Sequence, residues 1–214
     1  MMAFGCKSKR AGNTGGLGCE RSAGSVGKEW LLRLCLMAGA LLPLQAALAF
    51  DAMPRESTAQ GTLQAAFAPW DDIEGLVIDT IDRARTQILM QAYLITNKKI
   101  ATALIMAHRR GVDVRLLADA TQSHENATKV PMLAAAGIPV WLETRYQNAH
   151  NKVIVIDAAT SAATVVTGSF NFTWAAQHKN AENILIARNN PPLAARYALN
   201  WERQREQASA YSVP

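Results

Sequence analysis

"HNKVIVIDAATSAATVVTGSFNFT", which runs from His150 to Thr173, is the stretch of the sequence that decides the fold. Two apolar runs, "KVIVI" and "TVVTG", flank a short turn, and this pattern predicts a β-hairpin. Polar side chains recur at every second position near its open end: His150 and Lys152 before the turn, Ser169 and Asn171 after it. Because residues two apart in a strand face the same way, each pair shares one face.

The pairing of the two strands decides whether these side chains meet. The pairing that we predict across the "AATSAA" turn has three levels: Asp157 opposite Thr164, Lys152 opposite Ser169, and His150 opposite Asn171. In this register the four polar side chains form one patch, and Asp157, which has the opposite parity, points away from it. An unpaired polar patch on a buried strand face is costly, so the pattern indicates a functional site.

The four residue types of the patch suit a phosphodiester. A lysine supplies a cation, and asparagine and serine supply neutral donors to the charged oxygens of a phosphoryl group. A histidine can attack phosphorus or donate a proton to a leaving oxygen near neutral pH. The other histidines carry no such pattern: His108 and His124 are interpreted as structural or exposed. For His178, which ends the short predicted helix after the hairpin, contact with substrate stays open and a solvated position is favoured.

The rest of the chain predicts an α/β fold with a mixed β-sheet flanked by helices. The predicted strands cover residues 62–68, 86–95, 113–119, 138–143 and 183–188, besides the hairpin. The predicted helices cover 71–84, 97–110, a weak segment at 127–137, 173–178 and about 192–207. Two consecutive strand–helix–strand units favour a sheet with helices on its faces.

The N-terminus has the pattern of a targeting segment. An uncharged run, "LCLMAGALLPLQAALA", follows a basic region and ends at Ala49 in a small-x-small pattern. This predicts a signal peptide over residues 1–49, cleavage after Ala49, and a periplasmic or secreted protein. An uncleaved membrane anchor is the alternative, but the run is shorter than the roughly 20 residues of a spanning helix and contains Pro43. Translation could also start downstream, near Val26.

Charge and cysteine content change once this segment is set aside. The whole chain carries a formal charge of +5, of which residues 1–49 contribute +4 and the remainder +1. The basic balance therefore says little about a ligand. All three cysteines precede the predicted cleavage site, so the mature chain would have no disulfide or thiolate chemistry. We predict a flexible lead-in at residues 50–60 and a single domain at 61–214.

The hairpin also carries a family resemblance. "HNKVIVID" has the form H-x-K-x4-D, and "GSFN" downstream has the form G-S-x-N. Together they resemble the signature of the phospholipase D superfamily, and in particular its short, secreted, single-motif bacterial endonucleases. The similarity extends from about Phe67 to the C-terminal helix and includes "RGVDVRLLAD" and "KNAEN". It implies the α-β-α sandwich of the phospholipase D and nuclease fold.

The resemblance implies a role for each matching residue. His150 would be the nucleophile that forms a phosphohistidine, with Lys152 and Asn171 binding phosphate and Ser169 supporting them. Glu182, in "KNAEN", would hydrogen-bond to the histidine and orient it.

Asp157 and Gly168 also belong to the motif. The parity of the strand predicts a structural role for Asp157. Ten residues separate the two, where six is the usual family spacing, and we interpret the difference as a longer turn.

One copy of the motif supplies one histidine, whereas the two-step reaction needs a nucleophile and a proton donor. We therefore predict a homodimer in which His150 of each subunit faces the other in one composite site. No metal and no cofactor is expected, because no cluster with metal-ligand spacing is visible.

DNA is the predicted substrate of this metal-independent phosphodiesterase, with RNA as a further candidate. Trp174 could stack on a base, while Phe172 is more typical of core packing. The alternative is a phospholipase D that acts on phospholipid head groups. A third reading is a catalytically idle nucleic-acid-binding protein, which the intact motif and the small net charge disfavour.

Overall fold

The computed structural model describes residue 54 and residues 56–212. The predicted signal peptide and its cleavage site lie outside the described residues. Within the predicted lead-in, Pro54 and residues 56–60 are exposed and belong to no helix or strand. Whether that segment is flexible stays a prediction.

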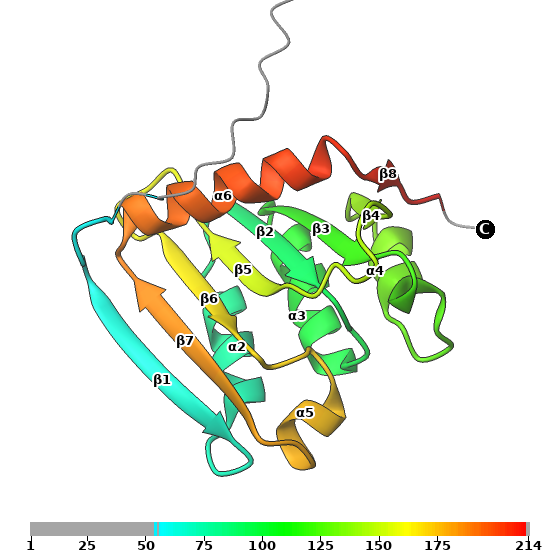
Figure 1. Cartoon of the computed structure of the whole chain (residues 1–214), viewed down its shortest axis with the longest axis horizontal. Coiled ribbons are helices and arrows are strands. Elements are labelled where there is room, and N and C mark those ends of the chain that lie inside the picture. Colours follow the sequence, from blue (N-terminus) through cyan, green and yellow to red (C-terminus); the bar gives the residue numbers. More distant parts are fainter. Residues whose placement is uncertain (1–53, 55, 213–214) are drawn as a thin grey trace, which may run out of the picture. The chain divides into compact units, whose positions relative to one another are not determined.

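An eight-stranded mixed sheet runs through the described part of the chain in the order β1-β7-β6-β5-β2-β3-β4-β8 (Figure 1). The strands are β1 (Thr62–Ala68), β2 (Gln87–Ala92), β3 (Asp113–Asp119), β4 (Val140–Glu143), β5 (Lys152–Ile156), β6 (Thr164–Gly168), β7 (Glu182–Arg188) and β8 (Ser209–Ala210). The pairs β2–β3 and β3–β4 are parallel, and the remaining pairs are antiparallel. The predicted mixed sheet is confirmed, while the two-residue edge strand β8 was not predicted.

Helices cover both faces of the sheet (Figure 1). They are α2 (Ile73–Asp82), α3 (Lys98–Arg109), α4 (Val130–Ala135), α5 (Trp174–His178) and α6 (Pro191–Arg205), with a 3₁₀ turn, η1, at Gln122–His124. The helix α6 lies across one face, over β6, β5, β2 and β4. None of the helices in the described residues is both long and apolar enough to span a bilayer.

Local sequence explains where the two longer helices of the other face begin and end. The Asp72 side chain accepts a hydrogen bond from the Gly75 backbone N–H at 2.8 Å and caps α2. Asn97 caps α3 by accepting from the N–H groups of Lys99 and Ile100. Such caps stabilise a helix by about 1 kcal/mol each. After α3 the chain turns at Gly111, whose φ of 90° is accessible mainly to glycine.

The core has two layers, one on each face of the sheet. One layer packs β-strand residues such as Ile88 and Ile154 against α2, α3, α4 and α5. The other packs Leu89 and Val155 against α6, whose Trp201 is fully buried. The Trp201 indole N–H donates to the Met90 carbonyl at 2.9 Å, so this buried polar group is satisfied.

The register of the β5–β6 hairpin differs by one residue from the prediction. Thr164 pairs with Ile156, not with Asp157, and Val153 pairs with Thr167. One step beyond this ladder, Lys152 is level with Gly168 rather than with Ser169. The predicted pairings of Lys152 with Ser169 and of His150 with Asn171 are therefore wrong.

Asp157 is the physical reason for the shift. Its backbone has a φ of 51°, which takes it out of the extended strand conformation and starts the turn one residue early. Its side chain, 3% exposed, accepts hydrogen bonds from the backbone N–H groups of Arg85, Thr86 and Gln87 and from the Thr86 hydroxyl. These bonds tie the hairpin to the start of β2, and spacing along the hairpin alone could not predict them.

Candidate active site

The predicted site residues lie at the end of the sheet where β6 ends and β5 and β7 begin. His150 precedes β5, and Lys152 is its first residue. Ser169 follows β6, and Glu182 is the first residue of β7. The structure gathers them in two hydrogen-bonded groups, one around Lys152 and one around Glu182.

The first group joins Lys152 to His150. The Lys152 ammonium nitrogen lies 2.8 Å from His150 Nδ1 and donates to the His150 carbonyl oxygen, also at 2.8 Å. The lysine side chain is buried, with 6% exposure, whereas His150 is exposed. Burial lowers the pKa of Lys152, and the negative charge of Glu182 partly opposes this shift. The arrangement is a partly desolvated cation beside an accessible imidazole.

This contact couples the protons of the two side chains. When Lys152 is an ammonium group it donates to Nδ1, and a neutral His150 ring then carries its own proton on Nε2. In that state Nε2 has no free lone pair and cannot attack. A nucleophilic Nε2 requires the ring proton on Nδ1, so Lys152 must first release that nitrogen.

The second group is centred on the Glu182 carboxylate. One oxygen accepts from the Ser169 hydroxyl at 2.6 Å, and the other accepts from the Asn180 side-chain amide at 2.9 Å. The hydroxyl oxygen of Ser169 accepts in turn from the Asn183 backbone N–H. Among the described residues, Glu182 makes no hydrogen bond to His150. The bond expected between them is therefore absent from this structure.

Asn171 lies two residues after Ser169 in the sequence, and the backbone contacts of its neighbour Phe172 fix its position. Phe172 forms a bridge to Ile95, with its N–H donating to the Leu94 carbonyl, and its ring is 2% exposed. The Asn171 amide oxygen is buried without a hydrogen-bond partner in the described part of the chain. This oxygen can only accept a hydrogen bond, so contact with a phosphoryl oxygen would use the side-chain NH₂ group of Asn171.

Gly168 permits a close approach between β6 and β7. A Cβ atom at this position would lie 2.2 Å from the Asn183 carbonyl oxygen, well inside van der Waals contact. Any larger residue would separate the strands and disturb Ser169, which is next in the chain. The glycine of the G-S-x-N motif therefore has a steric role.

Asp157 lies at the other end of β5 from Lys152 and contacts no other residue of the candidate site. Burial acts to raise the pKa of Asp157, but hydrogen bonds from the Gln87 and Thr86 backbone, the Thr86 hydroxyl and the Arg85 backbone outweigh it. The net effect lowers the pKa. The structure thus places this motif residue as an anchor beneath the hairpin.

Three residues near the site were not singled out from the sequence. Tyr93 packs its ring 4.3 Å from the His150 ring, measured between centroids. Asn180 and Asn183 hold Glu182 and Ser169. Both asparagines lie in "KNAEN", the stretch that also contains Glu182, so their place near the site could have been predicted from the sequence. The sequence offered no signal for Tyr93, because it continues an apolar run.

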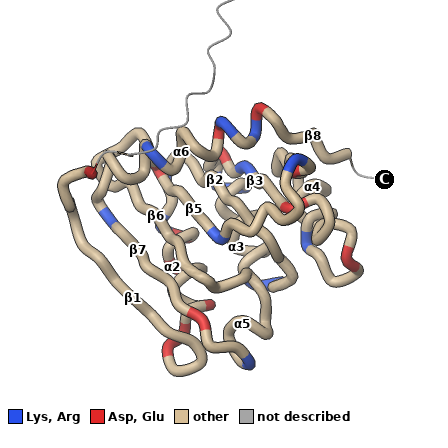
Figure 2. The backbone as a smooth tube through the Cα atoms, viewed as in Figure 1, with Lys and Arg blue, Asp and Glu red and all other residues tan. Residues whose placement is uncertain are grey.

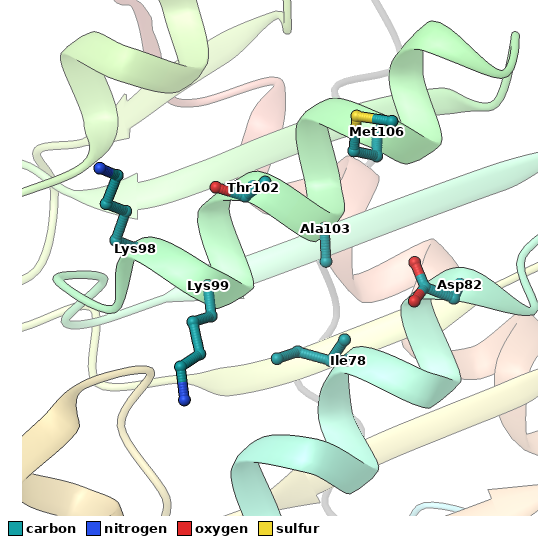
Figure 3. Close-up of a pocket in the computed structure, with 7 residues that line it drawn as sticks. All are labelled: Ile78, Asp82, Lys98, Lys99, Thr102, Ala103 and Met106. Carbon is teal, nitrogen blue, oxygen red and sulfur yellow. The ribbon is translucent and has the colours of Figure 1, made fainter.

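The described residues also form a groove outside the candidate site, and their charged side chains are widely distributed. A groove of about 430 Å³ separates α2 from α3 (Figure 3) and is lined by Ile78, Asp82, Lys98, Lys99, Thr102, Ala103 and Met106. Lysine and arginine positions are scattered among acidic ones rather than gathered on one element (Figure 2). Residues 54 and 56–212 contain no group of three or more His, Cys, Asp or Glu side chains arranged for a metal ion.

Comparison with known proteins gives one family. Residues 77–204 match the model of the cardiolipin synthase, phospholipase D-like domain. A phospholipase D of Rickettsia felis is 42% identical over 135 residues, which are 63% of this chain and 65% of that protein. A phospholipase D of Rickettsia prowazekii is 36% identical over 151 residues, 71% of each chain. This chain thus spans a little under two thirds of the first relative.

The solved structures agree with this result. The chain superimposes on Nuc of Salmonella typhimurium, a phospholipase D family member, with a TM-score of 0.66 and 37% identity. The match covers 70% of this chain and 97% of Nuc. NucT of Helicobacter pylori, at 21% identity and a TM-score of 0.62, shares the fold. With this family match, and with His150, Lys152 and the G-S-x-N residues at one end of the sheet, the chain belongs to the phospholipase D superfamily.

Proposed function

We propose that the protein is a phosphodiesterase that cleaves nucleic acid without a metal, through a phosphohistidine formed on His150. The observation that carries the proposal is the contact between the exposed His150 imidazole and the buried Lys152 ammonium group. The similarity to Nuc supports a nuclease. A phospholipase D acting on phospholipid head groups is the second candidate, supported by the names of the Rickettsia relatives.

The reaction has two steps in this proposal. Nε2 of one His150 attacks phosphorus, and the bond to the leaving oxygen breaks as a second His150, protonated on both ring nitrogens, gives that oxygen a proton. The second imidazole then takes a proton from water, whose oxygen attacks phosphorus and releases the histidine. Lys152 and Asn171 hold the charged phosphoryl oxygens throughout.

Substrate binding would prepare the attacking ring. A phosphate oxygen is a stronger acceptor for the Lys152 ammonium group than a neutral imidazole nitrogen. When Lys152 turns to the phosphate, Nδ1 of His150 becomes free to carry the ring proton, and Nε2 gains its lone pair. The copy of His150 that acts as the acid must carry protons on both ring nitrogens, so that it gives up the Nε2 proton and remains a neutral imidazole.

The two copies would come from two subunits of a homodimer. An exposed apolar face supports this proposal: Leu63, Phe67 and Leu185 are 65%, 52% and 40% exposed. Phe67 pairs with Asn183, which bonds to Ser169, so the face is continuous with the site. A second copy seated there would cover apolar surface and bring a second His150 towards the first.

Mixing subunits tests the composite site. We expect a nine-fold excess of His150→Ala chains to lower the activity per wild-type chain by about tenfold, because most wild-type chains then pair with an inactive partner. The measurement is DNA hydrolysis after the mixed chains have exchanged subunits, with His124→Ala chains as the matched control. Activity per wild-type chain that stays constant would contradict a shared site, as would an active preparation that sediments only as a monomer.

Trp174 separates a nucleic-acid substrate from a small diester. Its indole is 56% exposed at the start of α5, three residues after Asn171, and the Lys179 ammonium nitrogen lies 5.4 Å from the ring. Stacking of one base on an aromatic ring contributes about 1–3 kcal/mol. We therefore expect Trp174→Ala to raise KM for a single-stranded oligonucleotide by about 5- to 100-fold.

The controls for Trp174 use its own chemistry. Trp174→Phe, which keeps an aromatic face, should stay close to wild type. Hydrolysis of bis(p-nitrophenyl) phosphate, measured on the same chains, should not change with Trp174→Ala. An equal loss on both substrates would indicate damage to the site rather than loss of a stacked base.

The substrate class itself is tested by two assays run in parallel on the full chain. Plasmid degradation in EDTA is the expected result, together with little or no choline release from phosphatidylcholine vesicles. DNA cleavage that needs an added metal would contradict the proposed chemistry. Choline release without DNA cleavage would replace the nuclease by the phospholipase.

A further inference from the structure

The ring of Tyr93 contacts both His150 and Lys152 of the proposed site. Tyr93 follows the last residue of β2, and its backbone N–H donates to the Asn151 carbonyl at 2.9 Å. Its ring lies 4.3 Å from the His150 ring, with 50° between the planes. The Lys152 ammonium nitrogen lies 4.7 Å from the centroid of the same ring. One aromatic side chain therefore contacts both groups.

His150 and Lys152 have few other partners among the described residues, so their contact with Tyr93 matters more. Lys152 forms no salt bridge in the described part of the chain, and the Glu182 carboxylate that influences it bonds to Ser169 and Asn180 instead. The Tyr93 hydroxyl, 3.5 Å from the Asn148 side-chain oxygen, is only at the limit of a hydrogen bond. The described contacts of the His150 side chain are thus the Lys152 ammonium group and the ring of Tyr93.

We propose that Tyr93 is the positioning residue of His150, a role that rests on the proposed phosphodiesterase function. The electron-rich face of a tyrosine attracts cations, so it stabilises both the Lys152 ammonium group and the positive charge that His150 gains during the reaction. The ring also limits rotation of the imidazole.

A ring contact has an advantage over a hydrogen bond in this place. A carboxylate or lysine partner occupies one nitrogen of the imidazole and fixes where its proton lies. Tyr93 contacts the ring without using either nitrogen. His150 therefore stays oriented while Lys152 moves to the phosphate, and the same contact serves the attacking copy and the proton-donating copy.

Two substitutions in the full chain separate this role from packing. We expect Tyr93→Leu to lower kcat for bis(p-nitrophenyl) phosphate by about 5- to 30-fold with KM nearly unchanged, the range of a partly desolvated cation–π contact. Tyr93→Phe keeps the ring and should restore kcat to within about threefold of wild type. A Leu variant as fast as wild type, or a Phe variant as slow as the Leu variant, would overturn the inference.

Nuclear magnetic resonance checks the contact without relying on activity. The His150 ring protons, assigned by their loss in His150→Ala, should be shifted by the Tyr93 ring current in wild type and in Tyr93→Phe. In Tyr93→Leu they should move towards the position of the exposed His124. Unchanged His150 signals in the Leu variant would contradict the contact. A wild-type chain that cleaves no phosphodiester would overturn the proposed function, and the role of Tyr93 with it.

Discussion

His150→Ala is expected to lower the rate of phosphodiester hydrolysis by about 10⁴-fold or more, the scale on which removal of a covalent nucleophile acts. In the proposed dimer the substitution removes the attacking imidazole and the proton donor together. The His150 side chain is exposed and its described contacts are with Lys152 and Tyr93, so its loss leaves both core layers intact. We therefore expect a folded protein that lacks activity.

The measurement is plasmid degradation in EDTA, followed over time, with the melting temperature of each chain recorded beside it. His124→Ala is the matched control, because His124 is an exposed histidine in η1 outside the hydrogen-bonded groups of the site. DNA binding by His150→Ala should stay close to wild type, since Lys152 and Asn171 remain. A His150→Ala chain that keeps a tenth or more of the wild-type rate would rule out the phosphohistidine.

Asp157→Ala is expected to have the largest effect on stability, about 3–5 kcal/mol in the free energy of unfolding. The carboxylate accepts four hydrogen bonds, three of them from backbone N–H groups at the start of β2. Its removal leaves these donors unsatisfied, at a cost of about 1–3 kcal/mol for each that water cannot reach. Alanine also tolerates a φ of 51° less well than aspartate does.

Asp157→Asn is the matched variant for urea unfolding. It keeps an oxygen acceptor and the local tolerance of positive φ, so we expect it to lose about half as much stability as the alanine variant. Losses of less than 1 kcal/mol in both variants would contradict the anchoring role.

The lowered pKa of Asp157 also predicts how stability depends on pH. A carboxyl group whose folded pKa lies below its unfolded value of about 3.9 stabilises the fold fully above that value. The contribution is lost as the pH falls through the folded pKa, because the folded protein must then take up a proton. The loss of stability below about pH 4 should therefore be smaller in Asp157→Asn than in wild type.

Much of the fold follows from local patterns. The helices α2 and α3, the buried run of β2 and the strand β1 all lie within the ranges that the sequence predicted. Each depends on neighbouring residues, which a sequence displays directly. The strand β8 could not be foreseen, because two exposed residues carry no periodic signal.

The candidate site was harder to predict than the fold. His150 and Lys152 could be chosen from strand parity, but the register of the hairpin depends on Asp157 and its bonds to residues about 70 positions earlier. Tyr93 reaches His150 only because β2 pairs with β5. Contacts between distant segments of this kind depend on the assembled sheet. The proposed second subunit is harder still to predict, since a single chain shows no contact between two subunits.

The connection between β5 and β6 can change in length without a change in the geometry of the candidate site. Asp157 is hydrogen-bonded to the start of β2 at one end of β5, while His150 and Lys152 lie at the other end. Residues 158–163 lie beyond the anchor, and Ser161 and Ala162 are exposed. An insertion or deletion in this segment changes the loop on the solvent side of Asp157. The length of the loop can therefore vary during evolution without moving His150 and Lys152.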